Sequence, residues 1–467
     1  MYCSDEGFVI RSLNHFTSTK NLKEVKKLHG HLLRRGSFFS SFSIFTKLIF
    51  SCTSIQSHKS NQILTSFFSS MNFCNPLPFN MLLADFCQNG LPVSAIKTCS
   101  LMHTHGIPLD TYALCSSLTA ASSVKAVSFG KQVHAHLGKS GWSSSVFLGS
   151  AVVGLYSRSL FINDAEKAFI EIPMKNSFCV NALLAGYSEA KLWARGIEMI
   201  RQMPQLSLNY DYFTLTAALC ACAGLYATSL GKQVHGYVLR TTSGLETDIV
   251  LLSSLIEMYG RCGSIVKALQ VFNLSGLEFG LKQKRDVVLW TSMLGLYGRN
   301  GNYPEVIRLY HDMLREGVRP DKVAFVTVIS ACAHTGQVDL GLSYFKSMKN
   351  DFNLEPGQEH YSCLVDLLSR AGELERALEV VSAMPCKGHD TCVSLWGALL
   401  NACKERGNIS LAKMVVKKAL ELDPQNAGVM ALLSNTYAKL GMWDETEALT
   451  ILMKEQGMKK DAGCSWV

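Results

Sequence analysis

The sequence predicts an all-α fold, a superhelical α-solenoid of tandem antiparallel helix pairs. One observation is internal repetition: GKQVHAHLGKSG at 130–141 returns as GKQVHGYVLRTTSG at 231–244, with His134 and His235 101 residues apart. A second is that recurring segments of 35 residues each close on an Asp. A third is that apolar residues inside each segment recur at helical spacing. Self-similarity at such a period is typical of stacked repeats that pack only on their neighbours.

The 101-residue cycle divides into units of different lengths. Segments 76–110, 177–211 and 287–321 have 35 residues and end in Asp, whereas 146–176 has 31 residues. Units with the GKQVH box alternate with these. The predicted tandem array therefore runs over 76–390, as 76–110, 111–145, 146–176, 177–211, 212–248, 249–286, 287–321, 322–357 and 358–390. Residues 1–75 are a divergent N-terminal segment with a degenerate repeat.

Each unit reads as two helices. In 287–321 a first helix is indicated by apolar residues at helical spacing, namely Trp290, Met293, Leu294 and Tyr297. Asn300-Gly301-Asn302 then breaks the helix. A second helix with one apolar face follows, carrying Val306, Leu309, Tyr310 and Met313. Because one such pair cannot bury its apolar stripe alone, the pairs are expected to stack, with the first helices lining one surface.

Composition excludes several classes of protein. The chain has 48% hydrophobic and 18% charged residues, which indicates a globular protein. Its net charge of +8 fits a polyanionic partner but is mild for 467 residues. The sequence has no apolar run long enough to span a membrane.

None of the 16 cysteines forms a Cys-x-x-Cys motif and no His is followed by x-Glu, which excludes a zinc deaminase. Many cysteines lie in apolar helical runs, which points to a reducing compartment.

The first 75 residues are rich in Ser and poor in acid, with Asp5, Glu6 and Glu24 against nine Lys and Arg. This composition is typical of an organellar transit peptide. It predicts a mitochondrial protein, with the chloroplast as the alternative.

The His-x-His pairs, such as His134 and His136, are not expected to bind metal, because residues two apart on a helix point to different sides.

Several segments resemble the pentatricopeptide repeat family. They are the endings HGIPLD (105–110) and GVRPD (317–321), the run YGRCGSIVKALQVF (259–272), and the recurring Met102, Met203, Met313 and Met348. The alternation of long and short units is similar to the plant-specific PLS subclass. The C-terminal region from 355 onward resembles the E-type extension of organellar RNA-editing specificity factors. By that resemblance, 391–458 is an E-type extension similar to tetratricopeptide repeats, 459–467 is a truncated tail, and no DYW-type deaminase domain follows.

The resemblance implies a single-stranded RNA partner, one base per repeat, and no enzymatic activity or cofactor. In the family the base is read by the fifth and last residues of a repeat, which we call a reader pair. The reader pairs here are Asn80/Asp110, Ser150/Asn176, Asn181/Asp211, Ser253/Asp286 and Thr291/Asp321. By family analogy they favour U, A, U, G and G, which predicts a site resembling 5′-U-x-A-U-x-G-G-3′. The apolar residues three positions before each fifth residue would flank the bases: Leu77, Phe147, Phe178, Val250 and Val288.

The same residues allow other interpretations. An Asp or Asn at a repeat end is also an ordinary helix cap. The expected function is that of a site-recognition factor for C-to-U editing that recruits a deaminase in trans, with protein partners bound through 391–458. The alternatives are an RNA stability or splicing factor, a protein-binding scaffold of the tetratricopeptide type, and a truncated family member without function.

Overall fold

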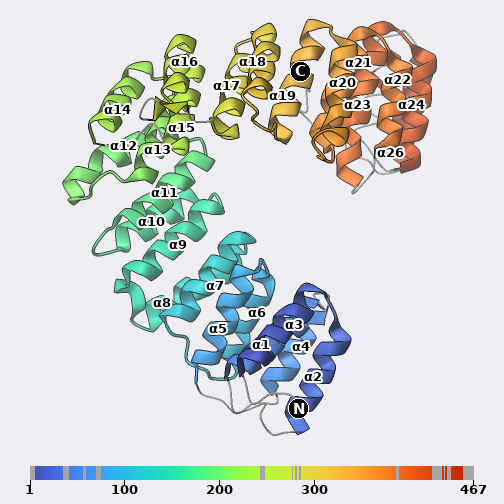
Figure 1. The fold of residues 1–467 in the computed structure, drawn as a ribbon. Coiled ribbons are helices and arrows are strands. Elements are labelled where there is room, and N and C mark those ends of the chain that lie inside the picture. The colour runs from blue at the N-terminus through green and yellow to red at the C-terminus, as the bar shows by residue number, and fades with distance from the viewer. Residues whose placement is uncertain are drawn as a thin grey trace. The chain divides into compact units, whose positions relative to one another are not determined.

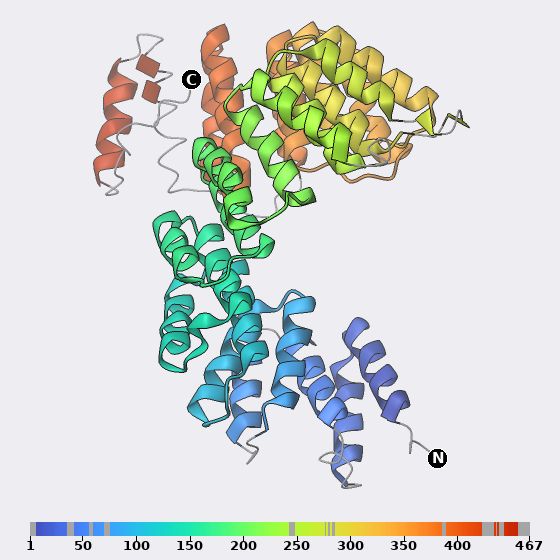
Figure 2. The same ribbon diagram turned by 90° about the vertical axis from the view of Figure 1, so that its left-hand side faces the viewer.

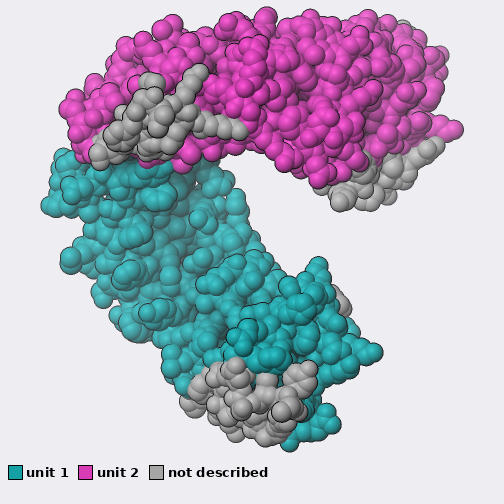
Figure 3. All heavy atoms as spheres, in the orientation of Figure 1, with its two compact units in different colours: residues 1–225 teal, residues 226–467 magenta. Residues whose placement is uncertain are grey.

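The structure, a computed structural model, describes most of the chain. The described residues are 6–34, 42–55, 59–69, 75–241, 248–275, 277–278, 281–282, 285–384, 389–422, 434–435, 437–438 and 443–455. The chain forms two compact units, residues 1–225 and 226–467 (Figure 3). In each unit the helices stand side by side in pairs (Figures 1 and 2), which confirms the all-α solenoid predicted from the sequence. Within the described residues, no helix is long and apolar enough to cross a membrane.

The first unit consists of helix pairs followed by the first helix of one more pair. Its helices are α1 (Glu6–Ser18), α2 (Leu22–Arg34), α3 (Phe42–Ile55), α4 (Ser60–Ser69), α5 (Leu77–Gln88), α6 (Pro92–Thr104), α7 (Thr111–Ser123), α8 (Val127–Lys139), α9 (Val146–Arg158), α10 (Ile162–Glu171), α11 (Ser177–Glu189), α12 (Trp193–Gln202) and α13 (Tyr212–Gly224). Short 3-10 helices η3 (Trp142–Ser144) and η4 (Met203–Leu206) follow α8 and α12. The divergent segment thus contains two helix pairs, α1–α2 and α3–α4, whose apolar faces are buried at Leu13, Val25, Leu48 and Leu64.

The second unit continues the same plan. Its helices are α14 (Thr228–Thr241), α15 (Ile249–Arg261), α16 (Ile265–Leu274), α17 (Val287–Arg299), α18 (Tyr303–Arg315), α19 (Lys322–Thr335), α20 (Val338–Asn350), α21 (Gln358–Ala371), α22 (Leu374–Ala383), α23 (His389–Arg406), α24 (Ile409–Leu422) and α26 (Trp443–Glu455). The one departure from helix in the described residues is a ribbon between α16 and α17, in which β1 (Leu277–Glu278) pairs antiparallel with β2 (Leu281–Lys282). It occupies the extra residues of segment 249–286.

The predicted break between the two helices of a pair is present. α17 ends at Arg299 and α18 begins at Tyr303, and Gly301 adopts a φ of 73°, a conformation that glycine reaches without strain. Apolar residues of α17 and α18 are buried as predicted, at Trp290, Met293, Leu294, Tyr297, Val306, Tyr310 and Met313. Leu309 was expected in the core and is only half-buried, because it lies at the edge of the apolar face of α18.

Small residues set how closely consecutive first helices approach. A methyl group on Gly186 of α11 would lie 2.6 Å from Ser157 Cβ and 3.0 Å from Ser157 Cα of α9. Gly154 of α9 has open space around its missing Cβ. Both glycines lie in helices of the first compact unit, but only Gly186 has no room for a side chain.

Gly186→Ala is expected to lower the melting temperature, by a destabilisation of about 1–3 kcal/mol, because the contact involves the backbone of α9 and cannot be relieved by a side-chain rotation. Gly154→Ala is the matched control and is expected to raise stability by about 0.5–1 kcal/mol through helix propensity. Thermal unfolding followed by circular dichroism checks both. Equal shifts for the two variants would contradict the close approach of α9 and α11.

Candidate nucleic-acid interface

The closing residue of each of the five reader pairs is the N-cap of the next first helix. Its side-chain oxygen accepts a hydrogen bond from a backbone N–H in the first turn of that helix, which satisfies a donor that has no partner within the helix. These caps are Asp110 to Ala113 N (2.9 Å), Asn176 to Cys179 N (3.0 Å), Asp211 to Thr214 N (2.9 Å), Asp286 to Val288 N (2.8 Å) and Asp321 to Ala324 N (2.8 Å). The capping interpretation of these residues is therefore correct. It leaves the second carboxylate oxygen of each Asp available for another donor.

Two reader pairs use that second oxygen. Asn80 Nδ2 donates to Asp110 Oδ2 at 2.6 Å, and Asn181 Nδ2 donates to Asp211 Oδ2 at 2.8 Å. Because an ionised carboxylate only accepts, the amide nitrogen is the atom that faces it, and one orientation of the amide is favoured. The Oδ1 atoms of Asn80 and Asn181 are shielded from solvent and have no hydrogen-bond partner among the described residues. A shielded acceptor without a donor costs free energy, which a donor on a ligand would recover.

The other three reader pairs are not joined in this way. Their hydroxyls donate instead to carbonyls of their own helix, Ser150 to Val146 O (2.7 Å), Ser253 to Val250 O (3.0 Å) and Thr291 to Val288 O (3.1 Å). Ser and Thr commonly make this local bond, which competes with contacts to more distant groups. In these three pairs the fifth residue presents a small side chain, and its closing partner serves as a cap.

Asp211 accepts more hydrogen bonds than the closing aspartates Asp110, Asp286 and Asp321 of the other reader pairs. Its Oδ1 accepts from Thr214 N and also from Thr214 Oγ1 at 2.6 Å, while its own N–H donates to Thr214 Oγ1 at 3.0 Å. This reciprocal arrangement is a capping box. Burial alone would raise the pKa of the Asp211 carboxyl, but the hydrogen bonds from Thr214 and Asn181 outweigh burial and lower it. The ionised form that orients Asn181 is therefore the favoured one.

An apolar row lies beside the reader pairs. The predicted flanking side chains are all exposed, Leu77 by 63%, Phe147 by 77%, Phe178 by 75%, Val250 by 47% and Val288 by 43%. The structure adds the corresponding residues of the intervening first helices, which sequence reasoning had not selected: Tyr112, Phe213 and Val323, also exposed. The same offset from the start of each unit would have identified them. Exposed apolar side chains at one position of successive helices are a feature of binding surfaces, and aromatic ones offer stacking platforms for bases.

The GKQVH box has a structural role. His134 Nδ1 lies 3.1 Å from the Tyr156 hydroxyl and His235 Nδ1 lies 2.9 Å from the Tyr259 hydroxyl, so each box histidine is joined to the following first helix. The box glycine Gly231 lets α14 approach α15, since a Cβ there would lie 2.4 Å from Met258 Sδ. Among the described residues, no group of three or more His, Cys, Asp or Glu is placed to hold a metal ion.

His235 predicts a pH dependence of stability. Burial, and secondarily the charge of Lys267, lower the pKa of His235 below its usual value of about 6.5. The folded state therefore resists a proton that the unfolded chain accepts, and stability should fall as the pH drops below about 6.5. We expect the decrease in melting temperature between pH 7.5 and 5.5 to be smaller in His235→Gln than in the wild type. An identical decrease in both proteins would refute this role for His235.

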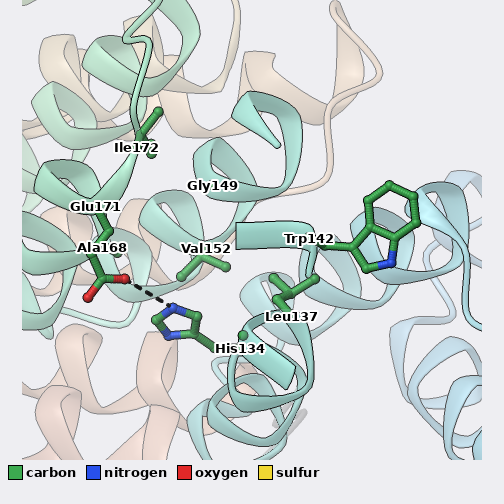
Figure 4. A pocket seen from close by; sticks show the side chains of 9 residues that line it. His134, Leu137, Trp142, Gly149, Val152, Ala168, Glu171 and Ile172 are labelled. Carbon is green, nitrogen blue, oxygen red and sulfur yellow. Dashed lines mark ion pairs between the residues drawn. The ribbon is translucent and has the colours of Figure 1, made fainter. Parts of the chain in front are cut away.

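A small pocket lies beside the first helix α9. It has a volume of about 90 Å³ and is lined by His134, Leu137, Gly138, Trp142, Gly149, Val152, Ala168, Glu171 and Ile172. His134 Nε2 and Glu171 Oε2 face each other at 3.7 Å at one end (Figure 4). Gly149 holds the fourth position of its repeat, where the other repeats from α5 to α19 bury Phe79, Leu114, Val180, Leu215, Leu252, Trp290 and Phe325. Ile172 packs beside Gly149 instead, since an added Cβ would lie 2.7 Å from Ile172 Cγ1. The pocket is a packing gap on the side of α9 away from Phe147.

The C-terminal extension is described only in part. α24, α26 and all but the first two residues of α23 lie within 391–458, and α23 and α24 bury Leu395, Trp396, Leu399 and Val415. Residues 423–433, 436 and 439–442 of this extension lie outside the described residues. Trp443 and Ile451 on α26 are exposed.

Tandem helix pairs with capped first helices and an exposed apolar row define a helical repeat protein. Comparison with known sequences is consistent with this class. A model of the PPR repeat matches residues 78–107, 250–274, 323–351 and 359–389, one of the PPR repeat family matches 285–334, and one of the E motif matches 406–467. A mitochondrial pentatricopeptide repeat-containing protein of Arabidopsis thaliana is 32% identical over 460 residues, covering 93% of this chain and 96% of that protein. The chain belongs to the pentatricopeptide repeat family.

Other relatives are longer. A putative pentatricopeptide repeat-containing protein of Arabidopsis thaliana is 34% identical over 393 residues, which are 83% of this chain but 53% of that protein. The chain thus spans about half the length of some relatives it matches. Among solved structures, the pentatricopeptide repeat protein PPR10 in complex with an 18-nt psaJ RNA element aligns with a TM-score of 0.63 at 15% identity, covering 90% of this chain and 61% of that one. That likeness supports the fold. None of the matched family models describes an enzyme.

Proposed function

We propose that this protein binds single-stranded RNA in an organelle and reads bases with its first helices. The observation that carries the proposal is the pair of oriented amides, Asn80 on Asp110 and Asn181 on Asp211, each beside an exposed apolar side chain. An amide whose donor and acceptor are fixed can distinguish base edges, while the apolar neighbour stacks on the base face. The solved complex of PPR10 with an RNA element, a protein of the same fold, supports this choice of ligand.

Bases are assigned separately to the reader pairs of the two compact units. In residues 1–225 the pairs Asn80/Asp110, Ser150/Asn176 and Asn181/Asp211 are assigned U, A and U, with one unread base after the first. In residues 226–467 the pairs Ser253/Asp286 and Thr291/Asp321 are assigned G and G. The small Ser and Thr side chains leave room for a purine, in keeping with their hydroxyls turning back on their own helices. Read in chain order, the assignment is 5′-U-x-A-U-x-G-G-3′.

The biological role we propose is site recognition for C-to-U RNA editing, with a deaminase recruited in trans through residues 391–458. Two observations support it, the E motif matched over 406–467 and the organellar names of relatives. Relatives named mitochondrial and chloroplastic both occur in Arabidopsis thaliana, and we assign the mitochondrion. Comparing organellar transcripts of wild-type and knockout plants tests the role. Loss of editing at defined cytidines supports it, whereas altered splicing or transcript levels with intact editing would assign the protein to those processes instead.

RNA binding itself is tested with the purified full chain. The affinity for a labelled RNA carrying the assigned bases is compared with that for the same bases in scrambled order, at one salt concentration, because phosphate contacts alone depend on salt and not on sequence. We expect tighter binding of the assigned order. Equal affinity for both RNAs would reject base reading. Partners retained after RNase treatment, together with no RNA binding, would favour a protein scaffold.

A further inference from the structure

We infer that Thr214 is a positioning residue that sharpens base discrimination at the Asn181/Asp211 pair, and that Ala113 leaves the Asn80/Asp110 pair less strictly oriented. The inference rests on the proposed RNA-reading function. The two pairs have the same residues, the same spacing and the same Asn-to-Asp hydrogen bond. They differ in the third residue of the following first helix, which is Thr in α13 and Ala in α7.

That difference changes how firmly the carboxylate is held. Asp211 Oδ1 accepts two hydrogen bonds, from Thr214 N and Thr214 Oγ1, whereas Asp110 Oδ1 accepts one, from Ala113 N. Thr214 is fully buried, so its hydroxyl cannot leave for water. With Oδ1 fixed by two donors, rotation of the Asp211 carboxylate is restricted, and Oδ2 stays directed at Asn181 Nδ2. Asp110 has no side-chain hydroxyl at this position to restrict it.

Carboxylate rotation matters because it controls the amide of the fifth residue. Along the Watson–Crick edge, uracil presents an acceptor at O4 beside a donor at N3, and cytosine presents the reverse order. An amide held in one orientation therefore matches one pyrimidine better than the other. If the carboxylate loosens, the amide can turn by 180°, exchange its donor and acceptor, and accept either base. Thr214 thus acts on the base through Asp211 and Asn181 and need not touch the RNA.

The charge of the pair is consistent with this chain of contacts. A hydrogen bond to an ionised carboxylate is stronger than one between neutral groups. Both bonds from Thr214 to Asp211 are of this kind. The closing aspartates Asp286 and Asp321 lack the side-chain bond, since they are followed at the same position by Leu289 and Ala324. Among the reader pairs built on an Asn and an Asp, the one in segment 177–211 is therefore the more rigid.

The test uses the full chain and four RNAs that carry U or C at the base assigned to Asn181 and U or C at the base assigned to Asn80. The readout is the ratio of the affinities for U and C at each position. A general loss of stability lowers affinity for all four RNAs and leaves the ratios unchanged. Thr214→Val removes the hydroxyl at nearly constant volume, Thr214→Ser retains it, and Ala113→Ser introduces it at the other pair.

We expect Thr214→Val to lower the ratio of the affinities for U and C at the Asn181 position roughly fivefold. Thr214→Ser should keep the wild-type ratio there, and neither variant should change the ratio at the Asn80 position. Ala113→Ser should raise the ratio at the Asn80 position, which keeps the inference testable if Thr214→Val folds poorly. Unchanged ratios in Thr214→Val and Ala113→Ser, with wild-type discrimination intact, would overturn the inference and leave the proposed function standing. A wild-type protein that binds all four RNAs equally would overturn both.

Discussion

Replacing Phe147 and Phe178 together by Ala is expected to weaken RNA binding roughly 100-fold. The two side chains are 77% and 75% exposed, so they contribute little to folding. Stacking of a base on an aromatic ring is worth about 1–3 kcal/mol, and two such contacts give a loss of about this size. The measurement is fluorescence anisotropy with a labelled RNA that carries the assigned bases.

The matched control for this variant is Val93→Ala with Ile170→Ala. These side chains are 59% and 73% exposed and lie on the second helices α6 and α10 of the same unit. The control should bind RNA as the wild type does, and both variants should melt within a few degrees of it. Equal losses of affinity in both double variants would indicate a non-specific effect of removing exposed apolar area, and would contradict base stacking on the first helices.

The second large effect is expected for Asp211→Asn, which should abolish most of the preference for U over C at one base. Asn is as good an N-cap as Asp, so helix α13 keeps its cap and stability changes little. Unlike a carboxylate, the new amide can donate as well as accept, and it no longer forces Asn181 Nδ2 to face it. The amide of Asn181 is then free to turn, and U and C become comparable ligands.

Affinity ratios for RNAs with U or C at that position measure the effect, and a decrease of about tenfold is expected. Asp110→Asn is the paired variant and should change the ratio only at the base assigned to Asn80. If either substitution altered the ratios at both positions equally, the assignment of one base to one reader pair would be wrong.

Much of this architecture follows from sequence periodicity. The 3.6-residue spacing of Trp290, Met293 and Tyr297 identifies a first helix, and the buried side chains of α17 lie where that spacing places them. The exposure of Phe147 and Phe178 also follows, since a fixed offset in a stacked repeat places them on one surface. Repetition makes these predictions robust, because each helix pair experiences nearly the same environment.

Other features depend on contacts between residues that periodicity does not weigh. The hydroxyls of Ser150 and Thr291 donate to carbonyls of their own helices, a local contact that depends on the side-chain rotamer and that apolar periodicity does not predict. The bond between Thr214 and Asp211 joins the residue that closes one repeat to the third residue of the next first helix, and periodicity does not relate these two positions. The packing at Gly149 depends on Ile172 of the same repeat, whose Cγ1 would lie 2.7 Å from a Cβ added to Gly149.

The most direct test of the account is selection of RNA by the purified full chain from a pool of random single-stranded sequences, followed by sequencing of the bound fraction. We predict enrichment of U at two positions separated by two nucleotides, with A immediately before the second U. We further predict that Asp211→Asn removes the enrichment of U over C at the second position only. A bound pool with no base enrichment, or one unchanged by this substitution, would contradict reading by the oriented amides.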